Sequence, residues 1–434
     1  MKQWKEGVGE IDFGEAHVHN MDKRLLIISN NVLSETSSNG KTILSYIDSI
    51  PKECVAQLYF SPETPRVEGY KYFRISDRDI LHGVFNSKLR GHEIEAVPLS
   101  VNSAAAKKKQ VPKNSLARLG REALWNHKWK SAALIQWLDE FKPTSVFFHA
   151  GDSIFAHKIF SFIVDRYKPI TTVFVTDDYV MPIQSEDAIS TFRRKLVRNS
   201  LGGVLDKAQE IFTISPQMRD AYKGLYNKDS SFLVNLTEPL LREEYRESDP
   251  DSIIFTYAGT LYFGREENIG LLADAIQRYN TQYPEKKKLV IHAYTSNTAG
   301  NDIRPDNPYL IFCGRVNKDE LIKVYNKSNY MLFVESFDSK QAEKTKYSLS
   351  TKVPEYLSLR KPILAIGPAG IGSMEYLRDV AACAFDADSI DNVLFRLVES
   401  KEMQDQLSNA AYDKYLKYHN REQLQQDFVS RVFA

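Results

Sequence analysis

The chain has 434 residues, of which 43% are hydrophobic and 26% charged, and its formal net charge is +1 at pH 7. Such a length is too great for one ordinary hydrophobic core, so two domains of a globular protein are expected. The near-neutral charge argues against a polyanionic partner such as nucleic acid.

Targeting and redox signals point to a cytoplasmic protein. The sequence has no run of about 18 apolar residues that could cross a membrane, and residues 1–20 lack the apolar core of a signal peptide. Three cysteines are scattered without metal-binding spacing, namely Cys54, Cys313 and Cys383. We therefore expect a reduced protein, and we interpret residues 1–22 as an N-terminal extension.

Apolar runs alternate with amphipathic stretches along the first half of the chain. Short apolar runs predict buried strands, and apolar residues at helical spacing predict the helices between them. Strands are expected at 24–29, 54–60, 71–75, 145–148, 170–175 and 211–214. This alternation predicts a doubly wound parallel sheet.

The loop after the first strand contains Gly40-Lys41-Thr42, which suggests a phosphate loop at first sight. That motif needs a glycine where this chain has Glu35, so a phosphate loop is excluded. Ligands bind beyond the carboxyl ends of strands in a doubly wound sheet. Asn39 and Gly40 are therefore candidate ligand-site residues, and ordinary turn chemistry is the alternative.

Two later strands also end in polar side chains. His149 and Asp152 follow the strand at 145–148, and Asp177 and Asp178 follow the strand at 170–175. All four are candidates for a ligand site at the carboxyl edge of the sheet. The alternatives are a hydrogen-bonded histidine at a strand end and aspartates that cap the next segment.

The region 107–130 is basic and contains Leu and Trp at helical spacing, including Trp125 and Trp129. Such a pattern suits an anionic membrane surface. A solvated face over a local core is the alternative.

The second half repeats the βα rhythm after a linker at 235–239. Strands are expected at 253–258, 289–293, 309–313, 330–334, 362–366 and 381–385, followed by a mostly helical C-terminal stretch. Residues 335–345 are expected to form a loop. Two βα domains that face one another across a cleft are the predicted architecture.

The segment 346–368 predicts a turn, a helix and a buried strand. Ser350 and Thr351 are good N-cap residues, so their side-chain oxygens are expected at the helix start. A helix N-terminus with Ser, Thr and Lys352 at a sheet edge is a natural anion site. Glu355, one turn further, is unexpected on a purely structural helix, although a solvated residue is the alternative.

This pattern resembles a GT-B glycosyltransferase, and most closely family 4 of the retaining glycosyltransferases. The resemblance extends from about residue 23 to the C-terminal helix. In the second half it is carried by YAGTLYFGR (257–265), IFCGRV (311–316) and YSLSTKVPEYLSLRKPILAIGP (347–368). In the first half it is carried by VFFHAGDS (146–153) and FTISPQMRDAYKGLY (212–226).

The resemblance implies a role for each matched residue. Arg265 and Lys352 would hold the donor diphosphate, and fixed positive charge stabilises such a leaving group. Glu355 would accept hydrogen bonds from the ribose hydroxyls. His149 would lie beside the sugar as a catalytic residue. The remaining donor-site residues would be Gly259, Thr260, Gly314, Arg315, Val316, Ser350 and Thr351.

The chain departs from the family at one position. The family often has two glutamates eight residues apart, and the earlier position here is Tyr347. Glu335 and Glu343 are the candidates to replace the missing acid.

The resemblance implies sugar transfer, with retention, from a nucleotide-diphosphate sugar to a polysaccharide or lipid-linked oligosaccharide, without a metal or other cofactor. Domains are predicted at 23–238, binding the acceptor, and 239–414, binding the donor, with a C-terminal helix at 415–434 that packs back on the first domain. The acceptor-side candidates are Asn39, Gly40, Asp152, Asp177 and Asp178. The basic region 107–130 would make peripheral contact with the inner membrane face. The alternatives are a nucleotide-sugar 2-epimerase of GT-B fold and a non-catalytic nucleotide-sugar-binding scaffold.

Overall fold

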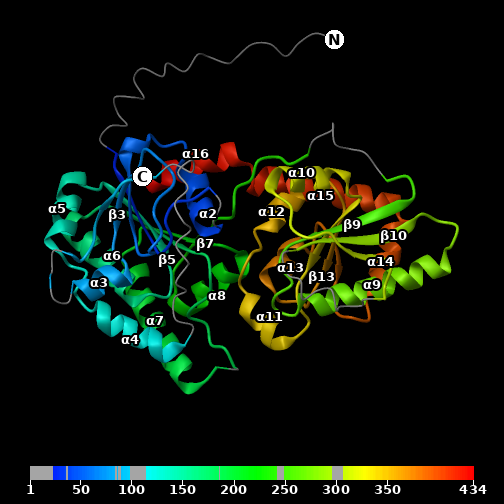
Figure 1. Cartoon of the computed structure of the whole chain (residues 1–434), viewed down its shortest axis with the longest axis horizontal. Helices are drawn as coiled ribbons and strands as arrows, with labels where there is room; N and C mark the ends of the chain where they lie inside the picture. The colour runs from blue at the N-terminus through cyan, green and yellow to red at the C-terminus, as the bar shows by residue number, and fades with distance from the viewer. Residues whose placement is uncertain are drawn as a thin grey trace, which may run out of the picture. The chain divides into compact units, whose positions relative to one another are not determined.

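The computed structural model describes residues 23–35, 38–83, 86, 89–97, 114–184, 186–241, 249–295 and 306–434. Within these residues the chain forms two compact units (Figure 1). The first contains residues up to Val173 together with 199–210 and 428–434, and the second contains 174–198 and 211–427. The expected extension at 1–22 lies outside the described residues.

The boundaries of these two units differ from those of the domains predicted at 23–238 and 239–414. Contacts group 174–198 and 211–238 with the second unit, although these segments precede the predicted linker. The division follows contacts and carries no information about which ligand each part binds. The domain roles therefore stay predictions.

The first sheet has the strand order β4-β3-β2-β1-β5-β6-β7-β8. Its strands are β1 (Leu25–Ser29), β2 (Val55–Tyr59), β3 (Lys71–Arg74), β4 (His92–Ile94), β5 (Ser145–Ala150), β6 (Ile170–Val175), β7 (Glu210–Thr213) and β8 (Ser231–Phe232). Strand β1 pairs in parallel with both β2 and β5. Because β2 and β3 lie on one side of β1 and β5 to β8 on the other, the strand order reverses between β1 and β5.

The helices that accompany this sheet are amphipathic or buried, as the pattern predicted. They are α2 (Ser38–Ile47), a short 3-10 helix at Lys52–Cys54, α3 (Asp77–His82), α4 (Ser115–Trp125), α5 (Ala132–Phe141), α6 (Ile154–Tyr167), α7 (Ala188–Leu205) and α8 (Pro216–Tyr226). The apolar strand β1 is buried along its whole length. This burial is typical of a central parallel strand covered on both faces.

The second sheet has the order β11-β10-β9-β12-β13-β14, and all its pairs are parallel. The strands are β9 (Ser252–Ala258), β10 (Lys288–Tyr294), β11 (Leu310–Phe312), β12 (Tyr330–Val334), β13 (Ile363–Ile366) and β14 (Ala382–Ala384). Here the order reverses between β9 and β12. Both strands are central in the sheet.

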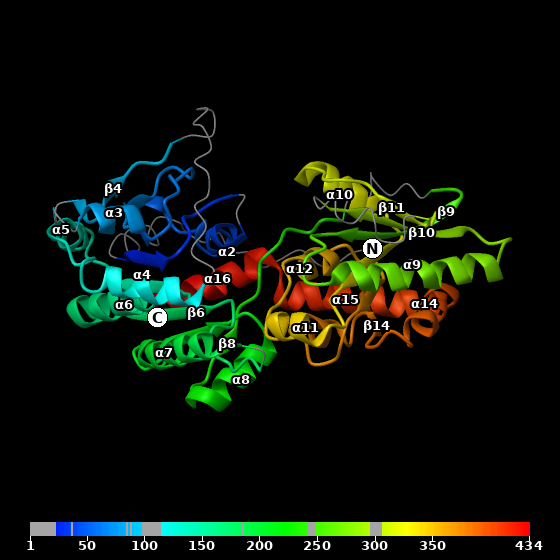
Figure 2. The same ribbon diagram turned by 60° about the horizontal axis from the view of Figure 1, so that its bottom comes forward.

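Helices cover both faces of the second sheet. The helices of this half are α9 (Arg265–Gln282), α10 (Lys318–Lys327), α11 (Ser339–Thr345), α12 (Lys352–Leu357), α13 (Gly372–Leu377), α14 (Ile390–Glu399) and α15 (Lys401–Tyr418), and the C-terminal helix α16 (Arg421–Val432) follows them. Figure 2 shows α9 and α14 on one face of the sheet and α10 on the other. The core between the sheet and the α9–α14 pair contains Phe255, Ile276, Leu332 and Leu394.

The structure corrects one local expectation and adds two details. Residues 339–345 form α11 instead of a loop, because the side chain of Asp338 caps the helix by accepting a hydrogen bond from the Gln341 amide at 2.9 Å. The antiparallel edge strand β4 was not predicted either. Helix α12 is short: it ends at Leu357, and the Ser358 amide caps its last turn.

The end of the C-terminal helix belongs to the first unit. Phe428 is fully buried, with its ring centroid 5.0 Å from that of Tyr46 and 5.2 Å from that of Phe147. Arg431 also forms an ion pair with Glu210. The last residues of the chain thus complete the core of its first unit.

Candidate functional site

The strand reversal between β9 and β12 places two loops side by side at the carboxyl edge of the second sheet. One loop follows β9 and leads to Arg265, and the other follows β12 and begins at Glu335. In doubly wound sheets the crevice at such a reversal is where ligands bind. The topology therefore places Arg265, predicted to hold the diphosphate, at the expected position.

Arg265 and Glu335 form an ion pair across this reversal. Nη2 of Arg265 donates to both carboxylate oxygens of Glu335, at 3.1 and 3.0 Å. Thr345 lies at 3.5 Å from the same carboxylate, and the Asn268 side chain donates to the Glu335 carbonyl at 2.6 Å. Burial raises the pKa of Glu335, and the charge of Arg265 opposes that rise.

Gly264 lets the β9–α9 loop bring Arg265 to this place. Its φ of +73° lies in the left-handed region that favours glycine. A Cβ atom there would lie 2.7 Å from Oγ of Ser336, on the other loop. The preceding residue, Phe263, also has a positive φ of 66° and is 44% exposed. Strained backbone of this kind is concentrated at functional sites.

Lys352 and Glu355 form a second pair on α12. Nζ of Lys352 lies 3.1 Å from Oε2 of Glu355, which also accepts a hydrogen bond from the Tyr325 hydroxyl at 3.3 Å. Tyr356, the next residue, accepts a hydrogen bond from the Ala258 amide at 3.3 Å. Because Ala258 is the last residue of β9, α12 lies at the same sheet edge as Arg265.

Of the two residues predicted to cap the start of α12, Ser350 and Thr351, only the first does so. Ser350 does accept a hydrogen bond from the Lys352 amide, at 3.3 Å. Thr351, in contrast, has helical dihedral angles and makes no side-chain capping bond. The backbone amide of Ser350 instead donates a hydrogen bond to the Ser373 hydroxyl at 3.0 Å. The expected cap at Thr351 is therefore wrong, because that residue already belongs to the turn.

The other predicted donor residues lie in loops at the same edge. Gly259 donates its amide to Tyr294, and the carbonyl of Thr260 accepts the Tyr257 hydroxyl at 2.6 Å. Gly314 (φ +73°), Arg315 and Val316 follow β11. Gly314 and Arg315 are exposed, and no described atom lies near a Cβ at Gly314. These groups are accessible at the strand ends.

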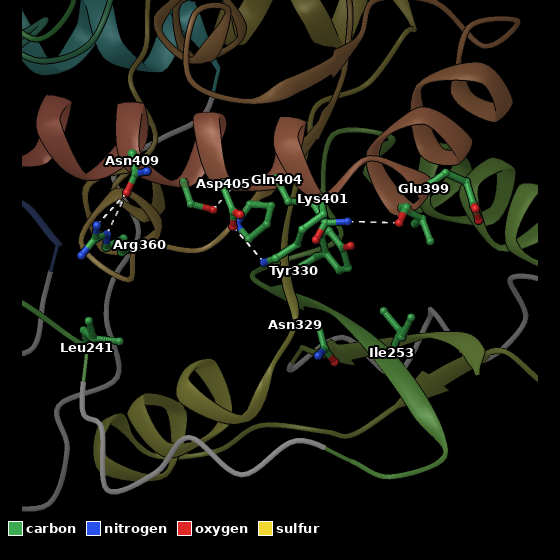
Figure 3. Close-up of a pocket in the computed structure, with 13 residues that line it drawn as sticks. Leu241, Ile253, Asn329, Tyr330, Arg360, Glu399, Lys401, Gln404, Asp405 and Asn409 are labelled. Atoms are coloured by element: carbon green, nitrogen blue, oxygen red, sulfur yellow. Dashed lines mark hydrogen bonds and ion pairs between the residues drawn. The ribbon is translucent and has the colours of Figure 1, made fainter. Parts of the chain in front are cut away.

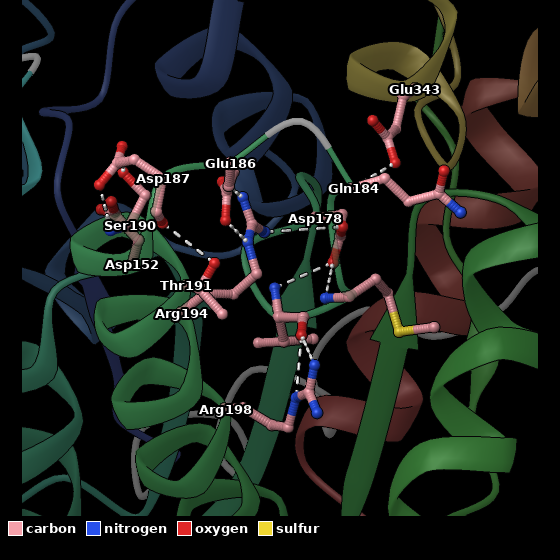
Figure 4. A network of polar contacts seen from close by, with 12 residues as sticks. Asp152, Asp178, Gln184, Glu186, Asp187, Ser190, Thr191, Arg194, Arg198 and Glu343 are labelled. Carbon is pink, nitrogen blue, oxygen red and sulfur yellow. Dashed lines mark hydrogen bonds and ion pairs between the residues drawn. The ribbon is translucent and has the colours of Figure 1, made fainter. Parts of the chain in front are cut away.

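The two candidates for the missing acid differ in their surroundings. Glu335 lies against Arg265, whereas Glu343 accepts the backbone amide of Gln184 at 3.0 Å (Figure 4). The carbonyl of Tyr347 accepts the Ser215 hydroxyl at 2.7 Å. Of the two glutamates, Glu335 is therefore the one that lies beside a residue predicted to bind the diphosphate, Arg265.

In the first unit the strand order reverses between β1 and β5. Two predicted site residues, His149 and Asp152, lie at or just after the carboxyl end of β5. His149 is buried near the end of β5. Asp152, three residues later, forms an ion pair with Arg118 at 2.5 Å. Asn39 and Gly40 lie in the first turn of α2 and not in a loop. A Cβ at Gly40 would lie 2.3 Å from the Val32 carbonyl, so close backbone contact accounts for this glycine.

His157 is a residue of this region that the sequence did not single out. Its Nε2 lies 2.9 Å from the Gly151 carbonyl, and its Nδ1 lies 2.9 Å from the Ser200 hydroxyl. A carbonyl only accepts, so Nε2 carries the proton and Nδ1 accepts from Ser200. Burial lowers the pKa of His157 to about 4. A neutral histidine thus fixes the loop between His149 and Asp152, and no spacing signal marked it.

Asp177 and Asp178 stabilise their own loop. Asp178 accepts the amides of Val180 and Met181, both at 3.0 Å, and Arg194 lies 4.0 Å from its other oxygen (Figure 4). Burial raises the pKa of Asp178. Asp177 lies 3.3 Å from the Tyr179 hydroxyl. This arrangement is the capping alternative stated for both aspartates.

The basic region 107–130 is described only from residue 114 onward, so Lys107 to Lys109 lie outside the described residues. Trp125 and Trp129 are buried, and Trp125 stacks on Phe155 with 3.7 Å between ring centroids. Arg121 pairs with Asp77 at 2.7 Å. In this part the residues cover a local core, which was the alternative to a membrane surface. No described helix is long and apolar enough to span a membrane.

A hollow of about 910 Å³ lies at the opposite, amino-terminal edge of the second sheet (Figure 3). Residues from the starts of β9 and β12 line it together with α15, and Arg360 and Asn409 point toward one another there. None of the predicted donor residues lines this hollow.

Comparison of the sequence with protein-family models and with curated proteins finds no match. Solved structures do match over nearly the whole chain. A trehalose-6-phosphate synthase from Burkholderia multivorans has a TM-score of 0.61 at 11% identity, covering 94% of this chain and 98% of its own. A sucrose-phosphate synthase from Thermosynechococcus elongatus has a TM-score of 0.60 at 11% identity, with the same two coverages of 94% and 98%.

HepE from Anabaena, in complex with UDP and glucose, has a TM-score of 0.53 at 8% identity, covering 93% of this chain and 98% of its own. At such low identities these likenesses show the fold alone. Together with the two parallel-sheet α/β units, they confirm the predicted GT-B fold. Membership of family 4 stays a prediction.

Proposed function

We propose that this protein is a glycosyltransferase that uses a nucleotide-diphosphate sugar. The observation that carries the proposal is the placement of Arg265 at the β9–β12 reversal, at the same sheet edge as α12 with Lys352 and Glu355. A departing nucleoside diphosphate needs fixed positive charge, and preorganised charge is usually the largest single catalytic effect. The GT-B fold supports the proposal, since two of its structural neighbours are sugar-phosphate synthases.

In this proposal Arg265 and Lys352 bind the diphosphate, with Ser350 and Thr351 beside them. Glu355 accepts hydrogen bonds from the ribose hydroxyls through the oxygen that Lys352 and Tyr325 leave available. The backbone of Gly259 and Thr260 lies under the phosphates, and residues 314–316 line the base. Positive side chains supply the charge, so no metal or other cofactor takes part.

The acceptor side is proposed from the first sheet and the loops that follow it. His149 acts beside the sugar, and Asn39, Gly40, Asp152 and Asp177 are acceptor candidates. Asp178 is the least available of this set, because backbone amides occupy one of its oxygens. The acceptor is a polysaccharide or a lipid-linked oligosaccharide, and the transfer proceeds with retention.

Peripheral membrane contact at the inner face is proposed only for the lysines that precede residue 114, since the described tryptophans are buried. Sedimentation with anionic vesicles at low salt tests it. A triple substitution of Lys107, Lys108 and Lys109 by Gln should reduce binding, and unchanged sedimentation would remove this part of the proposal.

The test of function is incubation with UDP-, GDP- and ADP-sugars and a membrane-lipid extract. A glycosyltransferase yields a new glycolipid together with free nucleoside diphosphate. A 2-epimerase consumes donor without acceptor and yields an epimerised sugar, and a scaffold yields neither. Arg265→Ala and Lys352→Ala should each lower transfer by about 10²-fold or more, whereas Lys401→Ala, at the opposite sheet edge, should not.

A further inference from the structure

Only two acidic residues are buried in the described part of the chain, and Glu335 is one of them. Glu335 is 3% exposed and Asp79 is 8% exposed. Asp79 has a structural reason for burial, since it completes a capping box with Ser76 at the start of α3. Glu335 caps no helix, and burying a carboxylate is costly unless a partner compensates its charge. Its charged partner is Arg265.

The geometry leaves Arg265 able to bind a further anion. Only Nη2 contacts Glu335. Among the described residues, Nε and Nη1 of Arg265 have no hydrogen-bond partner, so their three N–H groups are available. Glu335 therefore orients the guanidinium from the buried side without using up its donors.

The negative charge of Glu335, in contrast, opposes the binding of an anion. Lys352 is paired with Glu355, as Arg265 is with Glu335, so the four side chains together carry no net charge. A diphosphate bound to Arg265 would lie within several ångströms of the Glu335 carboxylate. At an effective dielectric constant of about 20, repulsion over such a distance is comparable with the gain from one oriented cation.

We propose that Glu335 limits how tightly the site holds a nucleoside diphosphate: as the buried counter-charge of Arg265 it keeps the arginine oriented while it weakens the affinity for the leaving nucleotide. This inference rests on the proposed function. Its consequence is release of the product, because a site with two uncompensated cations would retain a diphosphate. It also gives Glu335 a positioning role that differs from that of the acid missing at Tyr347.

The test is the dissociation constant of UDP, GDP and ADP, measured by titration calorimetry on the full chain. Glu335→Gln removes the charge but keeps an oxygen that can accept from Nη2. For the nucleotide that binds, it should lower Kd by roughly tenfold. Glu335→Asp keeps the charge and shortens the side chain, so it should not tighten binding. A purely structural role for Glu335 would weaken binding in both variants.

Two further variants complete the design. Asp79→Asn removes the other buried carboxylate, beside Arg74 in the first unit, and should leave Kd unchanged even if it lowers the melting temperature. Thr345→Lys brings a second cation to the Glu335 carboxylate and should also lower Kd. Since it leaves the buried acid in place, it keeps the test decisive if Glu335→Gln does not fold.

Equal or weaker binding in both Glu335→Gln and Thr345→Lys would overturn the inference and leave the proposed function intact. Wild-type protein that binds none of the three nucleotides and transfers no sugar would overturn the proposed function, and this inference with it.

Discussion

Nζ of Lys352 lies 3.1 Å from Oε2 of Glu355, three residues further along α12. The side chain proposed to bind phosphate is thus paired with the one proposed to bind ribose. The pair is partly exposed, at 29% and 21%, so solvent screens it and its own contribution to stability is small. Its value lies in holding two ligand groups in one orientation before the nucleotide arrives.

This pairing predicts different effects for two ligands, inorganic pyrophosphate and the nucleoside diphosphate that binds. Lys352→Gln should raise Kd for both by roughly tenfold, since a hydrogen bond to a charged group contributes about 1.5–3 kcal/mol. Glu355→Gln should weaken the binding of the nucleoside diphosphate alone, because pyrophosphate has no ribose. Competition calorimetry measures both. Equal weakening of both ligands by Glu355→Gln would contradict the ribose assignment, and Lys401→Gln serves as the unaffected control.

A methyl group at Gly264 should disturb the site through the backbone. Gly264→Ala forces a side chain into the left-handed region and toward Ser336. We expect a loss of about 1–3 kcal/mol in unfolding free energy and weaker nucleotide binding. Gly224→Ala is the matched control, because among the described residues no atom outside the local helix backbone and its chain neighbours lies within 4 Å of its Cβ position on α8. That change should stabilise the protein by about 0.5–1 kcal/mol, and the opposite ranking in urea titrations would refute the expectation.

The buried histidine His157 predicts a loss of stability in mild acid. Its pKa is about 4 in the folded protein and about 6.5 when unfolded. The unfolded state therefore binds more protons between these values, so stability present above pH 6.5 is lost as the pH falls. At pH 5 the loss from His157 is about 2 kcal/mol.

Unfolding followed by tryptophan fluorescence checks this prediction, since the described tryptophans, Trp125, Trp129 and Trp137, all lie in the first unit with His157. His157→Gln cannot ionise and should show a weaker dependence between pH 7 and pH 5. The pKa of His419, in the second unit, is likewise lowered to about 4 by burial, so its contribution adds in that unit. An equal pH dependence in wild type and His157→Gln would be inconsistent with a buried neutral imidazole.

Trp125 should behave as a core residue and not as a membrane anchor. It is fully buried, and its indole N–H donates to Asp77 at 2.6 Å. Trp125→Ala should therefore reduce the unfolding free energy by about 3–5 kcal/mol. Leu116, on the same helix and 61% exposed, is the control, and its replacement by Ala should change stability by less than about 0.5 kcal/mol. Similar melting temperatures for the two variants would argue for the membrane alternative.

The strands of both sheets could be predicted because their apolar runs are short and bounded by turn residues. The fold followed from their alternation with helices. Arg265, Lys352 and Glu355 could be located because each is tied to a local motif at a strand end or helix start. The ion pair between Arg265 and Glu335 could not, because the two residues are 70 positions apart and meet only through the strand order.

The errors have local physical causes. Residues 339–345 contain polar side chains throughout, so their helix carries no apolar periodicity, and the Asp338 cap was the available signal. Thr351 has a good capping side chain, but its backbone is already helical. His157 lies on an apolar helix, and its role in fixing the loop after β5 depends on hydrogen bonds with Gly151 and Ser200. Spacing along the chain does not reveal such partners.

The burial of Phe428 between Tyr46 and Phe147 has a consequence for synthesis. A ribosome makes the first unit's strands early, but Phe428, which completes their core, follows the whole of the second unit in the chain. The first unit cannot reach its final packing until Phe428 has been synthesised. Domains that fold during synthesis usually do so in order from the N-terminus. Here a C-terminal truncation before Phe428 should leave the N-terminal part exposed to chaperones and proteases.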